Sequence, residues 1–157
     1  MKKEHHYQAT ITWTGAESGS TADYKSYSRR HSAEVPGKKP LELSADPAFL
    51  GDPSTMNPED CLVVALSSCH MLSYLALAAM KGVEVIGYSD RPSGTMLQEN
   101  LGGRFSEVTL RPEVTIAAGS DKDLAKELHK TAGKVCFIAA SVNFPVTHEP
   151  IIRVKDG

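Results

Sequence analysis

The chain has 157 residues, of which 41% are hydrophobic and 23% charged, and its formal net charge is −2. This length suits one domain with a sizeable core, and the composition is ordinary for a soluble globular protein. The small net charge and the dispersed basic residues exclude a strong field for nucleic acid or anionic lipid. The charged N-terminus lacks the apolar segment of a signal peptide. We therefore expect one domain, residues 1–157, in a cytoplasmic protein.

The first part of the chain predicts β-strands. Residues 7–14 alternate polar and apolar side chains with a period of two, residues 24–35 predict a second strand, and residues 41–44 predict a short third one. The sequence Pro36-Gly37-Lys38-Lys39 predicts a hairpin turn between the last two. A loop rich in proline and glycine, residues 46–56, follows.

A long helix is predicted from Pro58 to about Met80. Asn57 can cap it, two acids follow in its first turn, and Gly82 is expected to end it. Residues 61–80 carry no Lys, Arg, Asp or Glu and are about as long as a membrane span. Polar side chains interrupt this stretch and no second span accompanies it, so we interpret it as the central helix of a soluble core.

The second half of the chain predicts further strands and one more helix. The strands are expected over residues 83–90, 94–97, 105–117 and 144–154. Ser120-Asp-Lys-Asp caps the second helix, which places Leu124, Leu128 and Ala132 on one face. Strands, helix, strands, helix and a last strand make an α+β plan, and no nucleotide-binding motif is present.

Three cysteines, Cys61, Cys69 and Cys136, are the most informative residues. Their odd number and the missing signal peptide argue against an extracellular disulfide scaffold. Cys69 lies in the predicted long helix, and Cys136 lies at or just after the end of the second. The pair is either two inert core residues or a reactive pair. A reactive thiol requires a pKa lowered by a cation or a helix N-terminus.

Several residues could assist Cys69. Glu59 precedes it by ten positions, nearly three helical turns, so the two residues share a helix face about 15 Å apart along the axis. Arg29 and Arg30 are the candidate cations, and on a strand they would point to opposite faces. Local evidence alone leaves Glu59 as an exposed first-turn acid and both arginines as solvated charges.

Other polar residues give weaker signals. His31 and His70 are interpreted as structural histidines, and Cys61 as a core residue. A hydrolase that uses Ser67 or Ser68 with His70 is disfavoured, because neighbouring helical residues diverge and no G-x-S-x-G motif exists. No metal-ligand cluster converges apart from His5-His6, so neither a metal nor an organic cofactor is expected.

Three segments together resemble the OsmC/Ohr family, the osmotically inducible protein C and organic hydroperoxide resistance proteins. They are Asn57-Pro58-Glu59, Ala65-Leu-Ser-Ser-Cys69-His-Met-Leu and Cys136-Phe-Ile-Ala-Ala-Ser141-Val. The resemblance covers nearly the whole chain, and the Cys-His-Met sequence marks a less characterised branch. It implies an α+β fold with antiparallel strands around a long central helix, in an intertwined homodimer with two active sites at the dimer interface.

The resemblance also implies residue roles. Cys69 is the peroxidatic cysteine, Cys136 the resolving one, and Glu59 holds the arginine that activates the thiolate. Arg30 is preferred to Arg29 for that arginine, since its distance to the following turn fits better. The implied activity is reduction of organic hydroperoxides through a Cys69 sulfenic acid and a Cys69–Cys136 disulfide, which an external dithiol (a lipoyl or thioredoxin-like protein) then reduces. The alternative is a non-catalytic dimeric stress-response or small-molecule-binding protein on the same scaffold.

Overall fold

The computed structural model describes residues 2–155. Contacts divide the chain into two compact units, Met1–Cys61 and Leu62–Gly157. The first unit contains β1 (Thr10–Thr12), η1 (Thr14–Ser18), β2 (His31–Glu34), β3 (Leu41–Leu43) and η2 (Pro47–Phe49). Its three strands form an antiparallel sheet in the order β1-β2-β3. The helix α1 (Pro58–Met80) begins in this unit and continues through the second.

The second predicted strand is shorter than the sequence pattern suggests. Only residues 31–34 of the predicted 24–35 pair with neighbours. The preceding segment folds around Arg29 instead, because its guanidinium donates hydrogen bonds to the carbonyl oxygens of Tyr24 and Tyr27. The predicted hairpin turn is confirmed: the Lys38 N–H donates to the Val35 carbonyl at 3.0 Å.

Both ends of α1 follow from side chains near the predicted boundaries. The Asn57 side chain accepts from the Asp60 N–H at 2.8 Å, and the Asp60 carboxylate accepts from the Asn57 N–H at 3.1 Å. These reciprocal bonds cap the first turn. At the other end Gly82 adopts φ +72°, and the Val83 N–H donates to the Ala78 carbonyl at 2.9 Å.

Only one face of α1 is buried. Its buried residues recur every fourth position: Leu66, His70, Tyr74 and Ala78. On another face Val64 and Leu72 are 51% and 62% exposed. By length and composition alone α1 could cross a membrane. Its buried stripe contributes to the packed core instead, with Tyr74 and Ala78 in one cluster and Leu66 in another.

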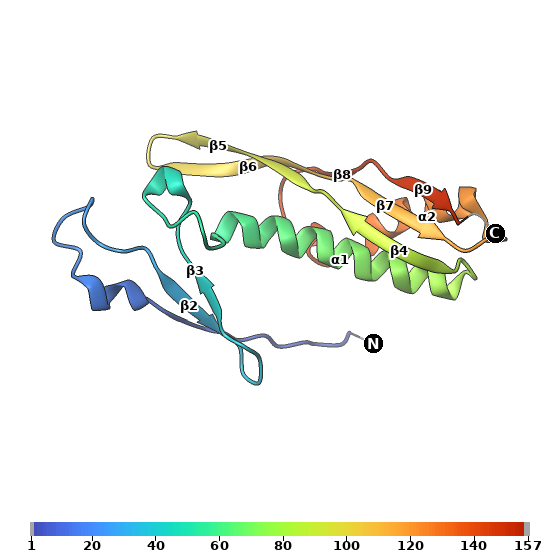
Figure 1. Ribbon diagram of the computed structural model, residues 1–157. Helices are drawn as coiled ribbons and strands as arrows, with labels where there is room; N and C mark the ends of the chain where they lie inside the picture. Colours follow the sequence, from blue (N-terminus) through green and yellow to red (C-terminus); the bar gives the residue numbers. More distant parts are fainter. Residues whose placement is uncertain (1, 156–157) are drawn as a thin grey trace. The chain divides into compact units, whose positions relative to one another are not determined.

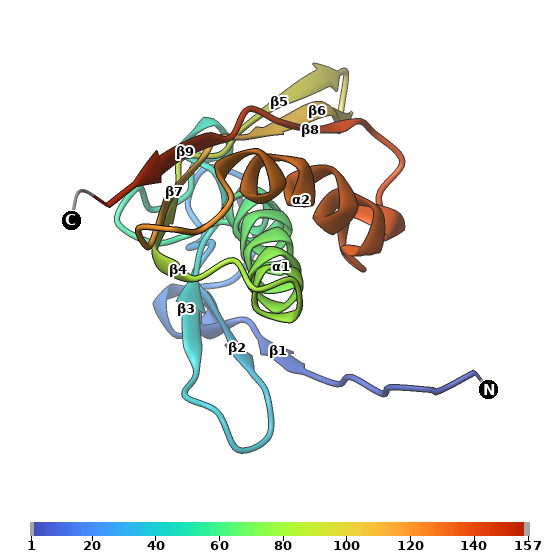
Figure 2. The same ribbon diagram turned by 90° about the vertical axis from the view of Figure 1, so that its right-hand side faces the viewer.

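The second unit places its helices on one face of a β layer (Figures 1 and 2). Its elements are β4 (Val85–Asp90), β5 (Ser93–Glu99), β6 (Gly102–Leu110), β7 (Pro112–Ile116), α2 (Lys122–Val135), η3 (Ala139–Ser141), β8 (Val146–His148) and β9 (Ile151–Val154). Two three-stranded sheets have the orders β4-β7-β9 and β5-β6-β8. Both are mixed, because β8 and β9 pair in parallel with β6 and β7.

Two predicted strands are each divided into two. The predicted strand 105–117 becomes β6 and β7, because the Arg111 N–H donates to the Asp90 carboxylate at 2.7 Å instead of to a strand, and Pro112 has no N–H to donate. The predicted strand 144–154 becomes β8 and β9, interrupted at Glu149-Pro150. At each of these two interruptions the chain passes from the β5-β6-β8 sheet to the β4-β7-β9 sheet.

The helix α2 presents a polar face to solvent and an apolar face to the core. Asp121 caps it by accepting from the N–H groups of Asp123 and Leu124, both at 2.9 Å. Its buried residues are Ala125, Leu128, His129 and Ala132. Ala125, Leu128 and Ala132 pack in one cluster with residues of α1, β7 and β9. Cys136 is the C-cap of the helix.

Candidate functional site

The second unit brings two of the predicted cysteines together. Cys69 is half-buried on α1, Cys136 is only 1% exposed at the end of α2, and both thiols are reduced. Burial first, and then the hydrogen bond of its thiol toward Cys69, raise the pKa of Cys136 to about 11. Cys136 therefore keeps its proton at neutral pH, and its thiol lies beside that of Cys69.

The turn after α2 holds the Cys136 sulfur in place. The Ala139 N–H donates to Cys136 Sγ at 3.4 Å, and the Ala140 N–H donates to the Cys136 carbonyl at 3.0 Å. The N–H of Ala139 favours a negative sulfur, but burial opposes it more strongly and sets the direction of the pKa change. This thiol is thus fixed in position and poorly ionised.

Glu59 lies in the first unit, at a cavity of about 320 Å³ that also contains Arg29. The Arg29 guanidinium lies 3.8 Å from the Tyr27 ring centroid and 5.0 Å from that of Tyr24, which are cation–π distances. Trp13 and Phe49 contribute apolar surface to the same cavity. No ion pair joins Glu59 to an arginine within residues 2–155.

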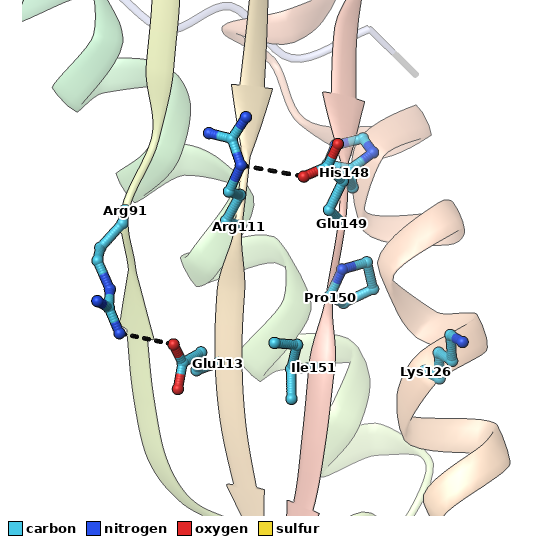
Figure 3. Close-up of a pocket in the computed structure, with 8 residues that line it drawn as sticks. All are labelled: Arg91, Arg111, Glu113, Lys126, His148, Glu149, Pro150 and Ile151. Atoms are coloured by element: carbon cyan, nitrogen blue, oxygen red, sulfur yellow. Dashed lines mark hydrogen bonds and ion pairs between the residues drawn. The ribbon is translucent and has the colours of Figure 1, made fainter.

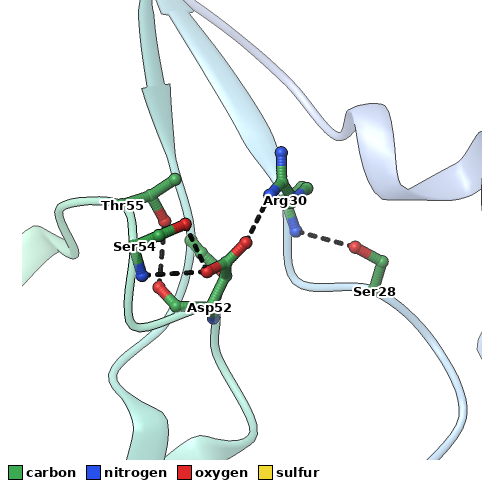
Figure 4. Close-up of polar contacts among 6 residues, drawn as sticks. Ser28, Arg30, Asp52, Ser54 and Thr55 are labelled. Carbon is green, nitrogen blue, oxygen red and sulfur yellow. Dashed lines mark hydrogen bonds and ion pairs between the residues drawn. The ribbon is translucent and has the colours of Figure 1, made fainter.

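Arg30, which the sequence analysis prefers, lies elsewhere in the first unit. It is exposed, does not line that cavity, and forms an ion pair with Asp52 (Figure 4). Hydrogen bonds from the Ser54 side chain and backbone, followed by the one from Arg30, lower the pKa of Asp52 to about 2. The structure therefore groups Glu59 with Arg29, a choice that the strand pattern could not make because residues 24–30 are not extended.

A cluster of histidines in the second unit was not predicted from the sequence. His70 on α1 and His129 on α2 lie edge to edge, with 2.9 Å between Nε2 of the first and Nδ1 of the second. Tyr74 stacks on His129 at 3.9 Å between ring centroids, and His148 of β8 stacks on His70 at 4.3 Å. The only sequence signal was His129 on the apolar face of α2, a pattern that also fits a core residue.

A groove of about 670 Å³ lies on the β layer of the second unit, next to α2 (Figure 3). Arg91 pairs with Glu113 at 2.7 Å, and Arg111 pairs with Glu149 at 3.0 Å. The hydrogen bond from Arg153 and then the charge of Arg91 lower the pKa of Glu113. The two acids of this groove thus each pair with a neighbouring arginine.

Two other kinds of site find no support among the described residues. No group of three or more His, Cys, Asp or Glu within residues 2–155 could hold a metal ion. The Ser67 hydroxyl donates to the Asp90 carboxylate at 2.5 Å. Ser67 is therefore bonded to a carboxylate, and the hydrogen bond of His70 goes to His129, so the serine–histidine arrangement of a hydrolase is not formed.

The profile of the OsmC family, described as OsmC-like protein, matches residues 51–150. The chain belongs to the OsmC family. No curated protein matches it by sequence. An OsmC-like protein of unknown function from Vibrio cholerae is 33% identical over 94% of this chain and 100% of its own, with a TM-score of 0.85.

Two OsmC-family structures with lower identity share the fold. One is an organic hydroperoxide resistance protein from Legionella pneumophila, 16% identical, covering 98% of this chain and 100% of its own, with a TM-score of 0.70. The other is the organic hydroperoxide resistance protein OhrB of Bacillus subtilis, also 16% identical, covering 95% and 98%, with a TM-score of 0.60. The α+β fold expected from the sequence resemblance is confirmed.

Proposed function

We propose that this OsmC-family protein is a thiol-dependent peroxidase that reduces organic hydroperoxides to alcohols. The feature that supports this most is the proximity of the Cys136 and Cys69 thiols, which lie close enough for Cys69 to raise the pKa of Cys136. Two inert core cysteines can lie anywhere in the fold, whereas two cysteines that form a disulfide must lie close together. The names of the relatives from L. pneumophila and B. subtilis, organic hydroperoxide resistance proteins, support the same chemistry.

Cys69 attacks the peroxide in the proposed first step. Its thiolate forms a bond to one peroxide oxygen, the O–O bond breaks, and the products are a Cys69 sulfenic acid and an alkoxide. The alkoxide takes up a proton and leaves as the alcohol. Cys69 has this role because Cys136 is buried and retains its proton, while Cys69 is partly accessible.

Cys136 resolves the sulfenic acid in the second step. Its sulfur bonds to the Cys69 sulfur, the S–O bond breaks, and the oxygen leaves as water with the thiol proton balancing the charge. The disulfide protects Cys69 from further oxidation. An external dithiol, such as a lipoyl or thioredoxin-like protein, then reduces it by thiol–disulfide exchange.

Arg29, in place of Arg30, is proposed as the arginine to which the family resemblance assigns activation of the thiolate. It shares a cavity with Glu59, the residue to which the family resemblance gives the role of holding the activating arginine. The Trp13, Tyr27 and Phe49 side chains around it favour organic peroxides over hydrogen peroxide. Arg30 is instead engaged by Asp52.

A homodimer is part of the proposal. The family resemblance implies one, and Val64 and Leu72 of α1 are exposed apolar side chains that a partner surface would cover. Sedimentation analysis at several protein concentrations measures the oligomeric state directly. A monomer at all concentrations would remove this part of the proposal.

Cysteine variants test the activity. The reduced protein is mixed with cumene hydroperoxide, and peroxide consumption and free thiols are measured together. We expect Cys69→Ser to abolish consumption and Cys136→Ser to allow one turnover without an intramolecular disulfide. Cys61→Ser is the matched control, since Cys61 is also half-buried on α1 and has no role in the mechanism. Equal consumption by Cys69→Ser would favour the non-catalytic alternative.

Arginine variants test the assignment of the cation. Arg29→Gln is expected to slow the first step on the order of 100-fold, as for loss of a charge-stabilising donor. Arg30→Gln is the matched control and is expected to keep the rate, because its guanidinium pairs with Asp52. The opposite order of the two rates would restore the role to Arg30.

A further inference from the structure

The cavity of about 320 Å³ that contains Arg29 and Glu59 has a wall of aromatic side chains. Trp13, Tyr27 and Phe49 come from three segments of the first unit: the residue after β1, the loop before β2 and the 3₁₀ helix η2. All three are partly exposed, so a molecule in the cavity meets their rings. Aromatic rings attract other rings in offset or edge-to-face arrangements, beyond the effect of burial alone. This lining therefore favours an aromatic ligand.

A hydrogen bond to the backbone holds Trp13 in this wall. The indole N–H donates to the Ser28 carbonyl at 2.7 Å. Gly15 lies beside this bond, and a Cβ there would come within 2.3 Å of the Ser28 oxygen and 2.5 Å of the indole nitrogen. The Gly15 N–H also donates to the Arg30 carbonyl at 2.9 Å, which joins the two segments. The absence of a side chain at Gly15 thus allows the indole to be fixed.

The other two rings are fixed as well. Tyr27 meets Trp13 edge-on, with 6.0 Å between the ring centroids and 85° between the planes. The Arg29 guanidinium lies over the Tyr27 ring at 3.8 Å. Phe49 ends η2, where its N–H donates to the Asp46 carbonyl at 2.8 Å. A wall that is formed before the ligand arrives loses little conformational entropy when the ligand binds.

The size and the polar groups of the cavity define the ligand further. Its 320 Å³ is near the lower end of the range of about 300–1,000 Å³ for small-molecule sites, so it suits a compact molecule better than a long acyl chain. Among the described residues, Arg29 gives one N–H each to the carbonyl oxygens of Tyr24 and Tyr27, and a guanidinium has five N–H groups. Arg29 therefore keeps donors for an oxygen atom of the ligand.

We infer that this cavity binds a compact aromatic molecule with one oxygen-containing group, and that Trp13 and Phe49 set this preference. The inference rests on the peroxidase function proposed above for the identity of the molecule, an aryl-alkyl hydroperoxide in preference to a linear one. The corresponding alcohol has the same ring and an oxygen but is not reduced. Its binding therefore tests the cavity separately from the reaction.

The single tryptophan of the chain reports on the cavity. Trp13 is the one tryptophan among the 157 residues, so fluorescence follows this wall alone. Two alcohols with the same number of carbon atoms, 2-phenyl-2-propanol and nonan-1-ol, are titrated into Cys69→Ser protein, which lacks the proposed peroxidatic thiol. We expect a saturable change with the aromatic alcohol, at a Kd about 10-fold lower than for the linear one. No saturable change, or equal Kd values, would overturn the inference.

Phe49→Leu, in the same background, separates the ring from the apolar surface. Leucine keeps an apolar side chain, so 2-phenyl-2-propanol should bind about 5-fold more weakly while the Kd of nonan-1-ol stays the same. Tyr7→Leu is the matched control, because Tyr7 is 91% exposed and does not line the cavity. An equal loss for both alcohols in Phe49→Leu would overturn the role of the ring. If Phe49→Leu does not fold, the comparison of the two alcohols in Cys69→Ser decides.

Turnover connects the cavity with the proposed reaction. The kcat/KM values for cumene hydroperoxide and for linoleic acid hydroperoxide, a linear substrate, are compared in the parent protein and in Phe49→Leu. Their ratio should fall about 5-fold in the variant. Binding of the aromatic alcohol without peroxide consumption by the parent protein would support the cavity and remove the peroxidase function. Peroxide consumption with an unchanged ratio and no aromatic binding would keep the function and overturn the inference.

Discussion

The buried histidines predict that acid destabilises the protein, and His129→Gln should remove the part of that effect that comes from His129. The unfolded chain binds a proton at each histidine below pH 6.5, whereas burial holds the folded-state pKa of His70 at about 4 and of His129 at about 3. Each site contributes stability that is present above pH 6.5 and is lost as the pH falls toward the folded-state value. At about 1.4 kcal/mol per pH unit, each loses about 2 kcal/mol by pH 5.

Urea denaturation under reducing conditions, at one protein concentration and at pH 7.5 and 5.0, measures the effect. His70 and His129 together contribute up to about 4 kcal/mol of the loss between the two pH values, so His129→Gln should lose about 2 kcal/mol less than the parent protein. His6→Gln is the matched control, because the His6 side chain is 88% exposed. If the loss is equal in His129→Gln and the parent, the buried neutral state of His129 is refuted.

Three further substitutions test the packing and chemistry. Gly133→Ala should destabilise the protein by about 1–3 kcal/mol in urea, since the new Cβ meets His148 at 2.6 Å; an increase in stability, as helix propensity alone predicts, would contradict the contact. Tyr74→Phe should keep or raise stability by about 1 kcal/mol, because the Tyr74 hydroxyl is buried without a partner; a loss above that amount would indicate a hydrogen bond. Cys136→Ser should let excess peroxide oxidise Cys69 to sulfinic acid, seen by intact mass, whereas an unmodified Cys69 would speak against the resolving role.

The local sequence predicted the elements whose causes are local. The bounds of α1 follow from a capping pair, Asn57 with Asp60, and from Gly82, all within a few residues of its ends. The sequence also predicts the alternating buried side chains of β6 and β7, which are Val108, Leu110, Val114 and Ile116. What failed was strand length, because Arg29 and Arg111 redirect the backbone through hydrogen bonds to carbonyls and to Asp90 that no periodicity encodes.

The candidate site likewise has one part that the sequence predicts and another that only the tertiary structure decides. Residue types and spacing identified Cys69, Cys136 and Glu59 as candidates through the family resemblance, and the sequence by itself determined the α+β class. Only the tertiary structure placed the Cys136 thiol against Cys69, grouped Arg29 with Glu59 and assembled His70, His129 and His148. These groups are formed by residues far apart in the chain. They depend on how the elements pack in three dimensions, which the local sequence pattern does not encode.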